Sequence, residues 1–189
     1  MSSPVPDQTI INNVLNGDTS QYNELILRHK DYAYSLALKI LRNPQDAEEV
    51  AHDAFIKAFN ALKGFNHQAK FSTWLYRIVF NTAVSHQRKH KIVTEDIAEL
   101  KAEPISNKTS NEPLLKQDQQ RFVQEAMAKL VPLDTSLITL FYMKQLNLDE
   151  IGEIVGLKPN LVKVKLFRAR KRLARELEKI LHTEVVEII

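Results

Sequence analysis

The chain has 189 residues, with 44% hydrophobic and 26% charged residues, four glycines and no cysteine. This balance is typical of a globular protein, and the length is sufficient for two small helical domains. The lack of cysteine excludes disulfides, thiol nucleophiles and cysteine-based zinc sites, and the four glycines fit no phosphate-binding loop pattern. We find no N-terminal targeting pattern and no apolar run long enough to cross a bilayer, so we expect a cytoplasmic protein without membrane insertion.

The basic residues are concentrated in two stretches, although the formal net charge is only +3. No acidic residue occurs between Asp53 and Glu95, and none occurs between Lys158 and Arg175. Either stretch alone could be an ordinary solvated helix face. Two basic surfaces on one chain favour a polyanionic partner that is contacted at two places.

Apolar residues recur with a helical period over most of the chain, which predicts an all-α protein. A first helical region covers about residues 9–42. Asn43 and Pro44 then match the N-cap and the first-turn proline of a new helix, which we expect to end near Gly64. Another helix is expected over about residues 72–90.

Helical periodicity is lost over residues 92–116, which contain prolines, polar residues and scattered acids. This composition predicts an extended, mobile linker. Its net negative charge suits passage through a basic nucleic-acid channel. The alternative is a simple tether whose length alone matters. We therefore predict two small helical domains, residues 1–91 and 117–189, the second ending in an acidic tail.

The second domain contains a helix-turn-helix pattern. Asn147 and Glu150 have the spacing of a capping box, Gly156 supplies a turn, and Pro159 opens a second helix. Arg172 would add a phosphate contact beside the face of that helix that we expect to contact DNA. This face comprises Lys158, Asn160, Leu161, Lys163, Val164, Lys165, Phe167, Arg168, Arg170 and Lys171. An ordinary basic surface helix is the alternative, but it would leave apolar side chains exposed without a reason.

In the first domain, the segment between Asp53 and Glu95 carries aromatic rings among amides and cations, without any acid. Single-stranded nucleic acid requires this combination, because bases stack on rings and the backbone meets the charges. The expected contacts are Phe65, Asn66, His67, Lys70, Phe71, Arg77, Asn81, Arg88 and Lys89. In particular, the loop of residues 65–67, closed against Asn81, could form a pocket for an extruded base. The alternative assigns Phe65 and Phe71 to core packing and Asn81 to the solvated surface.

Three segments resemble the extracytoplasmic-function sigma factors. Residues 71–78, followed by Asn81, resemble the promoter-melting and minus-10 recognition segment of that family. Residues 43–55 resemble its core-polymerase-binding helix, and residues 156–170 are similar to its minus-35 reading helix. The three segments occur in the family's order and at its spacing.

This resemblance implies a sigma region 2-like bundle and a region 4-like helix-turn-helix domain. It implies a transcription initiation factor, without enzymatic activity or cofactor, that recruits core RNA polymerase to promoters. The partners would be the large catalytic subunits and promoter DNA, both double-stranded and melted, and an anti-sigma factor is a further candidate. The polymerase would dock on one stripe of the helix that follows Pro44, formed by Asp46, Glu49, Asp53 and Ile56.

Two other interpretations have weaker support. A helix-turn-helix repressor or a response-regulator output domain would explain the second basic block, but not the aromatic segment or the linker. His86 and His90 have a spacing that can hold zinc. No carboxylate or cysteine is near them in sequence, and the neighbouring cations would repel a dication, so we expect no metal site.

Overall fold

The computed structural model describes residues 5–95 and 114–188, and every regular element in these ranges is helical. The helices are α1 (Asp7–Leu15), α2 (Tyr22–Leu41), α3 (Pro44–Ala61), α4 (Phe71–Glu95), α5 (Leu114–Ala128), α6 (Pro132–Ile138), α7 (Leu148–Val155) and α8 (Pro159–Ile188). The all-α prediction is confirmed. α4 and α5 both extend into the predicted linker of residues 92–116, and the rest of that linker lies outside the described residues.

The first domain is built on the packing of α2, α3 and α4 against one another. α3 begins as the sequence predicts, because the Asn43 side chain accepts hydrogen bonds from the backbone N–H groups of Gln45 (2.9 Å) and Asp46 (3.3 Å). Ala47 and Ala54 are fully buried on its inner face, and these small side chains allow the neighbouring helices to approach closely.

Helix α1 is held to this bundle through Asp7. The Asp7 carboxylate lies 3.0 Å from Nη1 of Arg28 and 2.8 Å from Nε2 of His29, both on α2. The other ring nitrogen of His29 lies 3.2 Å from the hydroxyl of Tyr76 on α4. These contacts fix α1 beside the start of α4.

The second domain contains the predicted capping box and turn. The Asn147 side chain accepts hydrogen bonds from the backbone of α7, and the Glu150 carboxylate accepts one from the Asn147 N–H. Gly156 has a φ of 73°, a left-handed conformation that favours glycine. At Gly152 a Cβ would lie only 2.5 Å from the Leu157 carbonyl oxygen, so this close approach also requires glycine.

An ion pair between a buried carboxylate and an exposed arginine joins α6 to α8. Asp134 is only 2% exposed, and its carboxylate lies 2.6 Å from Nε of Arg172. The Arg172 guanidinium neutralises a carboxylate that would otherwise be buried without a counter-charge. Half of the Arg172 side chain remains exposed, so its expected phosphate contact stays a prediction.

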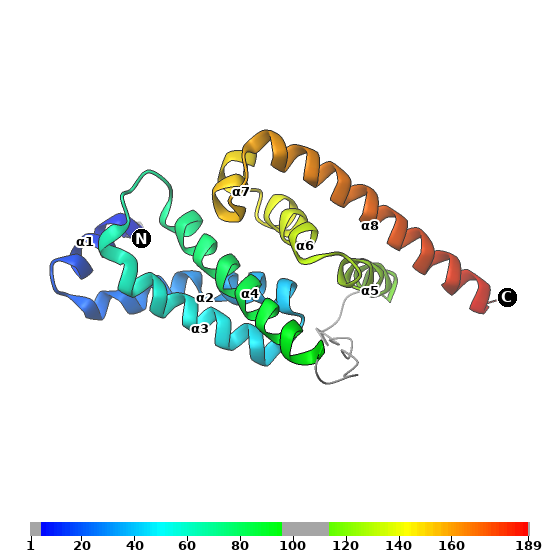
Figure 1. Ribbon diagram of the computed structural model, residues 1–189, viewed down its shortest axis with the longest axis horizontal. Helices are drawn as coiled ribbons and strands as arrows, with labels where there is room; N and C mark the ends of the chain where they lie inside the picture. Colours follow the sequence, from blue (N-terminus) through cyan, green and yellow to red (C-terminus); the bar gives the residue numbers. More distant parts are fainter. Residues whose placement is uncertain (1–4, 96–113, 189) are drawn as a thin grey trace.

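The two domains pack against each other, with α7 beside the first turns of α4 and α6 against α2 (Figure 1). Lys70 Nζ lies 2.8 Å from the Glu150 carboxylate, and Lys144 Nζ lies 3.9 Å above the ring of Tyr32. Arg42 donates a hydrogen bond to the Leu130 carbonyl oxygen at 2.5 Å. The sequence analysis did not predict this contact between the two domains.

None of the helices within the described residues combines the length and the apolar character that a membrane span needs.

Candidate nucleic-acid and polymerase interfaces

Helix α8 has a buried face and an exposed face, as its sequence predicts. Val162 and Ala169 are fully buried. Leu161, Val164 and Phe167 are 44%, 45% and 55% exposed on the other side. Lys158, Asn160, Lys163, Arg168, Arg170 and Lys171 are also exposed, whereas Lys165 is half-buried. Apolar side chains therefore lie among cations on a surface helix, an arrangement suited to base edges flanked by phosphates.

Two cations of this helix are positioned by aromatic rings. Lys171 Nζ lies 4.8 Å from the centre of the Phe167 ring. The Arg170 guanidinium lies 5.2 Å from the ring of Phe141 and 5.1 Å from that of Tyr142. These cation–π contacts restrict where the two charges can point.

The aromatic residues of the first domain are mainly core residues. Phe65 and Phe71 are only 6% and 5% exposed, and both rings pack against Trp74 at 5.1 Å and 5.8 Å. The His67 ring, which is exposed, lies 4.6 Å from that of Phe65. Neither phenylalanine is therefore a freely exposed stacking platform.

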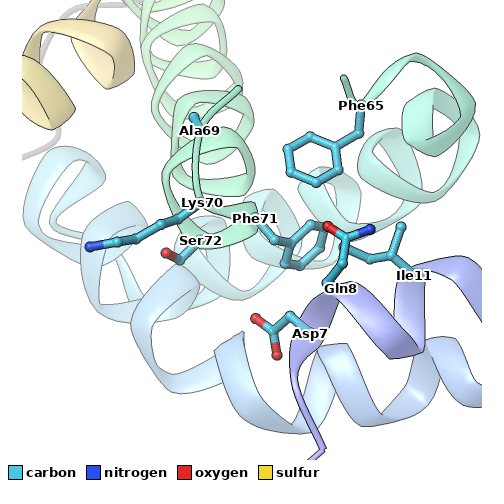
Figure 2. A pocket seen from close by; sticks show the side chains of 8 residues that line it. All are labelled: Asp7, Gln8, Ile11, Phe65, Ala69, Lys70, Phe71 and Ser72. Carbon is cyan, nitrogen blue, oxygen red and sulfur yellow. The ribbon is translucent and has the colours of Figure 1, made fainter. Parts of the chain in front are cut away.

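A hollow of about 320 Å³ nevertheless opens beside these rings (Figure 2). It is lined by Asp7, Gln8, Ile11, Phe65, Ala69, Lys70, Phe71 and Ser72. Helix α1 therefore forms one wall, a role that the sequence did not suggest. Asn81 was expected to close this pocket, but it does not belong to the lining.

The polar residues expected at the minus-10 contact lie exposed on α4 and its preceding loop. They are Asn66, His67, Arg77, Asn81, Arg88 and Lys89. Lys70 is also largely exposed but forms the ion pair with Glu150. The hydrogen bond from Lys70, aided by the Asn147 N–H, holds the pKa of Glu150 below its usual value. The contribution of this pair to domain packing is therefore complete at neutral pH and is lost as the pH falls through the lowered pKa.

The stripe expected to bind polymerase lies on the surface of α3. Glu49, Asp53 and Ile56 are exposed, and Asp46 is half-buried. Ile56 is an apolar side chain beside the acids, with 48% of its surface accessible.

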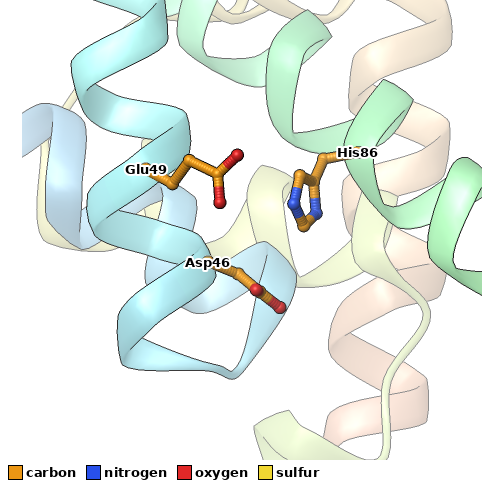
Figure 3. Close-up of side chains that lie close together, drawn as sticks. All are labelled: Asp46, Glu49 and His86. Atoms are coloured by element: carbon orange, nitrogen blue, oxygen red, sulfur yellow. The ribbon is translucent and has the colours of Figure 1, made fainter.

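Two acids of this stripe meet a histidine of α4. The side chains of Asp46 and Glu49 point toward His86, and their potential ligand atoms all lie within 4.8 Å of one another (Figure 3). Among the described residues, this group is able to hold a metal ion. The sequence argument against a metal rested on the absence of nearby carboxylates and on repulsion by neighbouring cations. The fold supplies two carboxylates from a different helix, while Arg88 and Lys89 still follow His86 on α4. The side chain of His90 lies outside the described residues.

Comparisons with known proteins agree with this arrangement. The family model of Sigma-70 region 2 matches residues 25–92, and that of Sigma-70 region 4 matches residues 122–173. The first match covers the bundle with α4, and the second covers the helix-turn-helix domain.

Known sigma factors match this chain over nearly its whole length and over nearly the whole of their own. The ECF RNA polymerase sigma factor SigW of Bacillus subtilis is 30% identical over 176 residues, which cover 88% of this chain and 94% of SigW. The ECF RNA polymerase sigma-E factor of Escherichia coli is 28% identical, with coverage of 96% and 99%.

The fold has a counterpart in the sigma factor RpoE from Bartonella quintana, solved in complex with the anti-sigma factor NepR. The TM-score is 0.70 at 19% identity, with 83% of this chain and 96% of that chain covered. CnrH, solved with the cytosolic domain of CnrY, gives a TM-score of 0.67 at 21% identity, with coverage of 92% and 97%. From its two matched regions and its full-length relatives, the chain belongs to the extracytoplasmic-function sigma factors, the promoter-recognising initiation factors of RNA polymerase.

Proposed function

We propose that the two domains divide promoter recognition between them. The exposed face of α8 reads the minus-35 duplex, and α4 with its preceding loop binds the melted minus-10 strand. The α3 stripe of Asp46, Glu49, Asp53 and Ile56 docks on the large catalytic subunit of core polymerase. The exposed apolar side chains among the cations of α8 support this division most directly.

Within α8, position on the helix separates base-reading residues from phosphate-binding ones. Asn160, Val164 and Arg168 follow one another at four-residue spacing and share one exposed stripe. The amide and the guanidinium of this stripe can form paired hydrogen bonds with base edges, and Val164 can contact a thymine methyl group. Lys163 lies beside the stripe and is assigned to the phosphate backbone.

Arg168→Ala should relax sequence preference at one promoter position and cost about 1–3 kcal/mol there. Lys163→Ala should weaken binding evenly over all sequences and reduce its salt dependence. Binding of each variant holoenzyme to a library of minus-35 sequences at several salt concentrations measures both effects. Indistinguishable sequence profiles for the two variants would refute the division between readers and phosphate contacts.

Promoter opening without ATP requires the protein to trap unpaired bases. Flipping a base costs a few kcal/mol of stacking and pairing, which contacts to the flipped base must offset. The hollow beside Phe65 and His67 offers aromatic walls, and Asn81 lies exposed on the same helix as the cations Arg77 and Arg88. We assign the hollow to an extruded minus-10 base and Asn81 to an adjacent base or sugar.

Asn81→Ala should leave polymerase binding and closed-complex formation nearly unchanged and slow open-complex formation, by about 1–3 kcal/mol for one lost base contact. Stopped-flow fluorescence of a labelled minus-10 element measures the rate. Ser85→Ala, an exposed polar residue one turn later on α4, is the matched control. A template with unpaired minus-10 bases should rescue Asn81→Ala at least in part, and an unchanged opening rate on duplex DNA would remove Asn81 from the site.

Polymerase docking is assigned to the outer face of α3. The acidic stripe faces away from the buried alanines, and Ile56 adds an apolar contact next to the charges. A charge pair that becomes desolvated in an interface is costly to break, because the remaining partner is left without a counter-charge.

Asp53→Lys should therefore weaken association with core polymerase by roughly 2–5 kcal/mol. Glu48→Lys reverses an exposed acid on the same helix but outside the stripe, and it should have a much smaller effect. Fluorescence anisotropy with purified core polymerase measures both affinities. Equal affinities of the two folded variants would contradict the docking assignment.

The packed arrangement of the domains cannot serve both promoter elements. By their names, the minus-35 and minus-10 elements lie about 25 base pairs apart, which is about 85 Å of duplex at about 3.4 Å per base pair. α4 packs on α7, and a short turn joins α7 to α8, so the two DNA-binding faces lie within the width of a few packed helices, about 20–30 Å. We infer that the domains separate when the factor binds polymerase and promoter.

A zero-length carbodiimide reagent should join Lys70 to Glu150 in the free protein, because their charged atoms are 2.8 Å apart. In the open promoter complex this cross-link should be lost. Lys179 and Glu176, 2.6 Å apart within α8, are an internal control that should react in both states. Mass spectrometry measures both yields, and an undiminished Lys70–Glu150 product in a transcribing complex would contradict domain separation.

Two further assignments follow from family membership. The solved relatives include sigma factors in complex with anti-sigma factors, which supports a similar protein regulator for this chain. The site of action is the cytoplasm, where polymerase and promoters are found.

A further inference from the structure

We propose that Asp46, Glu49 and His86 form a binding site for a divalent transition-metal ion such as Zn²⁺, between α3 and α4. The site lies outside the residues assigned to DNA. It shares two carboxylates with the stripe assigned to polymerase docking.

The three donors come from helices whose backbones are fixed by the core. On α3, Ala47 and Val50 are buried next to Asp46 and Glu49 in sequence, and on α4 Ala83 is buried one turn before His86. The ligand atoms lie within 4.8 Å of one another. Donors bound at about 2.1 Å to a tetrahedral ion are about 3.4 Å apart, so small side-chain rotations suffice to close the site.

The donor set selects a class of metal. One imidazole nitrogen and two carboxylate oxygens suit zinc and its neighbours, with water in the remaining position. Calcium and magnesium prefer six or more oxygen ligands, including several waters, and gain little from the ring nitrogen. The two carboxylates also repel each other at this distance, and a dication between them removes that repulsion.

Positive charge at the start of α3 and on α4 opposes the ion. The partial charge of the α3 N-terminus acts on Asp46, which lies in the first turn, and fades at Glu49 beyond it. Arg88 and Lys89 follow His86 on α4, but both are exposed, so their flexible chains can turn into solvent. The exposed Glu49 leaves an entry path for the ion.

Metal binding should compete with polymerase docking, a consequence that rests on the proposed function of the α3 stripe. Coordination would neutralise Asp46 and Glu49 and hold them toward α4. Only Asp53 would then keep its negative charge in the stripe, so the ion would weaken assembly of the holoenzyme.

The test uses the full chain, freed of metal by dialysis against a chelator. Co²⁺ binding is followed by visible absorption, and Zn²⁺ binding by competition with a chromophoric chelator. We expect one equivalent to bind. Glu49→Gln and His86→Gln should each weaken affinity at least about tenfold, since loss of even an outer-shell partner costs about 10–100-fold. His52→Gln, which removes an exposed histidine of α3 outside the cluster, should bind like the parent chain.

Absence of saturable binding, or equal affinity of the parent and His86→Gln, would overturn the site. Circular dichroism shows whether each variant is folded, and broadening of the His86 ring signals by Co²⁺ locates the ion independently of affinity. Zn²⁺ should also weaken association of the parent with core polymerase, but not that of His86→Gln. If Zn²⁺ binds and association is unchanged, the metal site stands and docking through Asp46 and Glu49 is refuted.

Discussion

Helix α4 contributes to the core, to the exposed polar surface and to the contact between the domains. The rest of the structure depends on how its surface is divided among these three roles. One face supplies core residues such as Leu75 and Val79, which pack against α2 and α3. Another leaves Arg77 and Asn81 in solvent, and the first turns pack against α7 of the second domain. A helix can divide its surface in this way because side chains three and four positions apart share a face. Changes at its buried positions therefore affect the proposed DNA-binding surface and the domain contact together.

Much of the local structure could be predicted from the sequence, because it depends on residues close together in the chain. The Asn43 cap, the capping box at Asn147 and the turn at Gly156 each involve neighbours within a few positions. The exposed apolar face of α8 also follows from periodicity, since Val162 and Ala169 fix which side is buried. Local hydrogen bonding and amphipathicity decide these features.

The sequence could not predict the contacts that depend on how helices meet. The Asp134–Arg172 pair spans 38 positions, so nothing in the sequence indicated that Arg172 has a buried carboxylate as a partner. The hollow beside Phe65 has a wall from α1, because Asp7 is held by residues of α2. His86 likewise lies close to two acids of α3 only because α4 packs against α3. Periodicity identifies the face on which a residue lies, but packing alone decides what that face meets.

The domain contact and the proposed minus-10 site share a residue, which would couple domain separation to DNA binding. Lys70 lines the hollow and is also the partner of Glu150 in the other domain. Its side chain is 74% exposed, so the pair contributes only about 0–1 kcal/mol, and most of the domain contact comes from the packing of α7 on α4 and of α6 on α2. Separation releases the ammonium group at the edge of the hollow, where a phosphate can replace the carboxylate. By thermodynamic reciprocity, DNA that binds Lys70 must then favour the separated domains to the same extent.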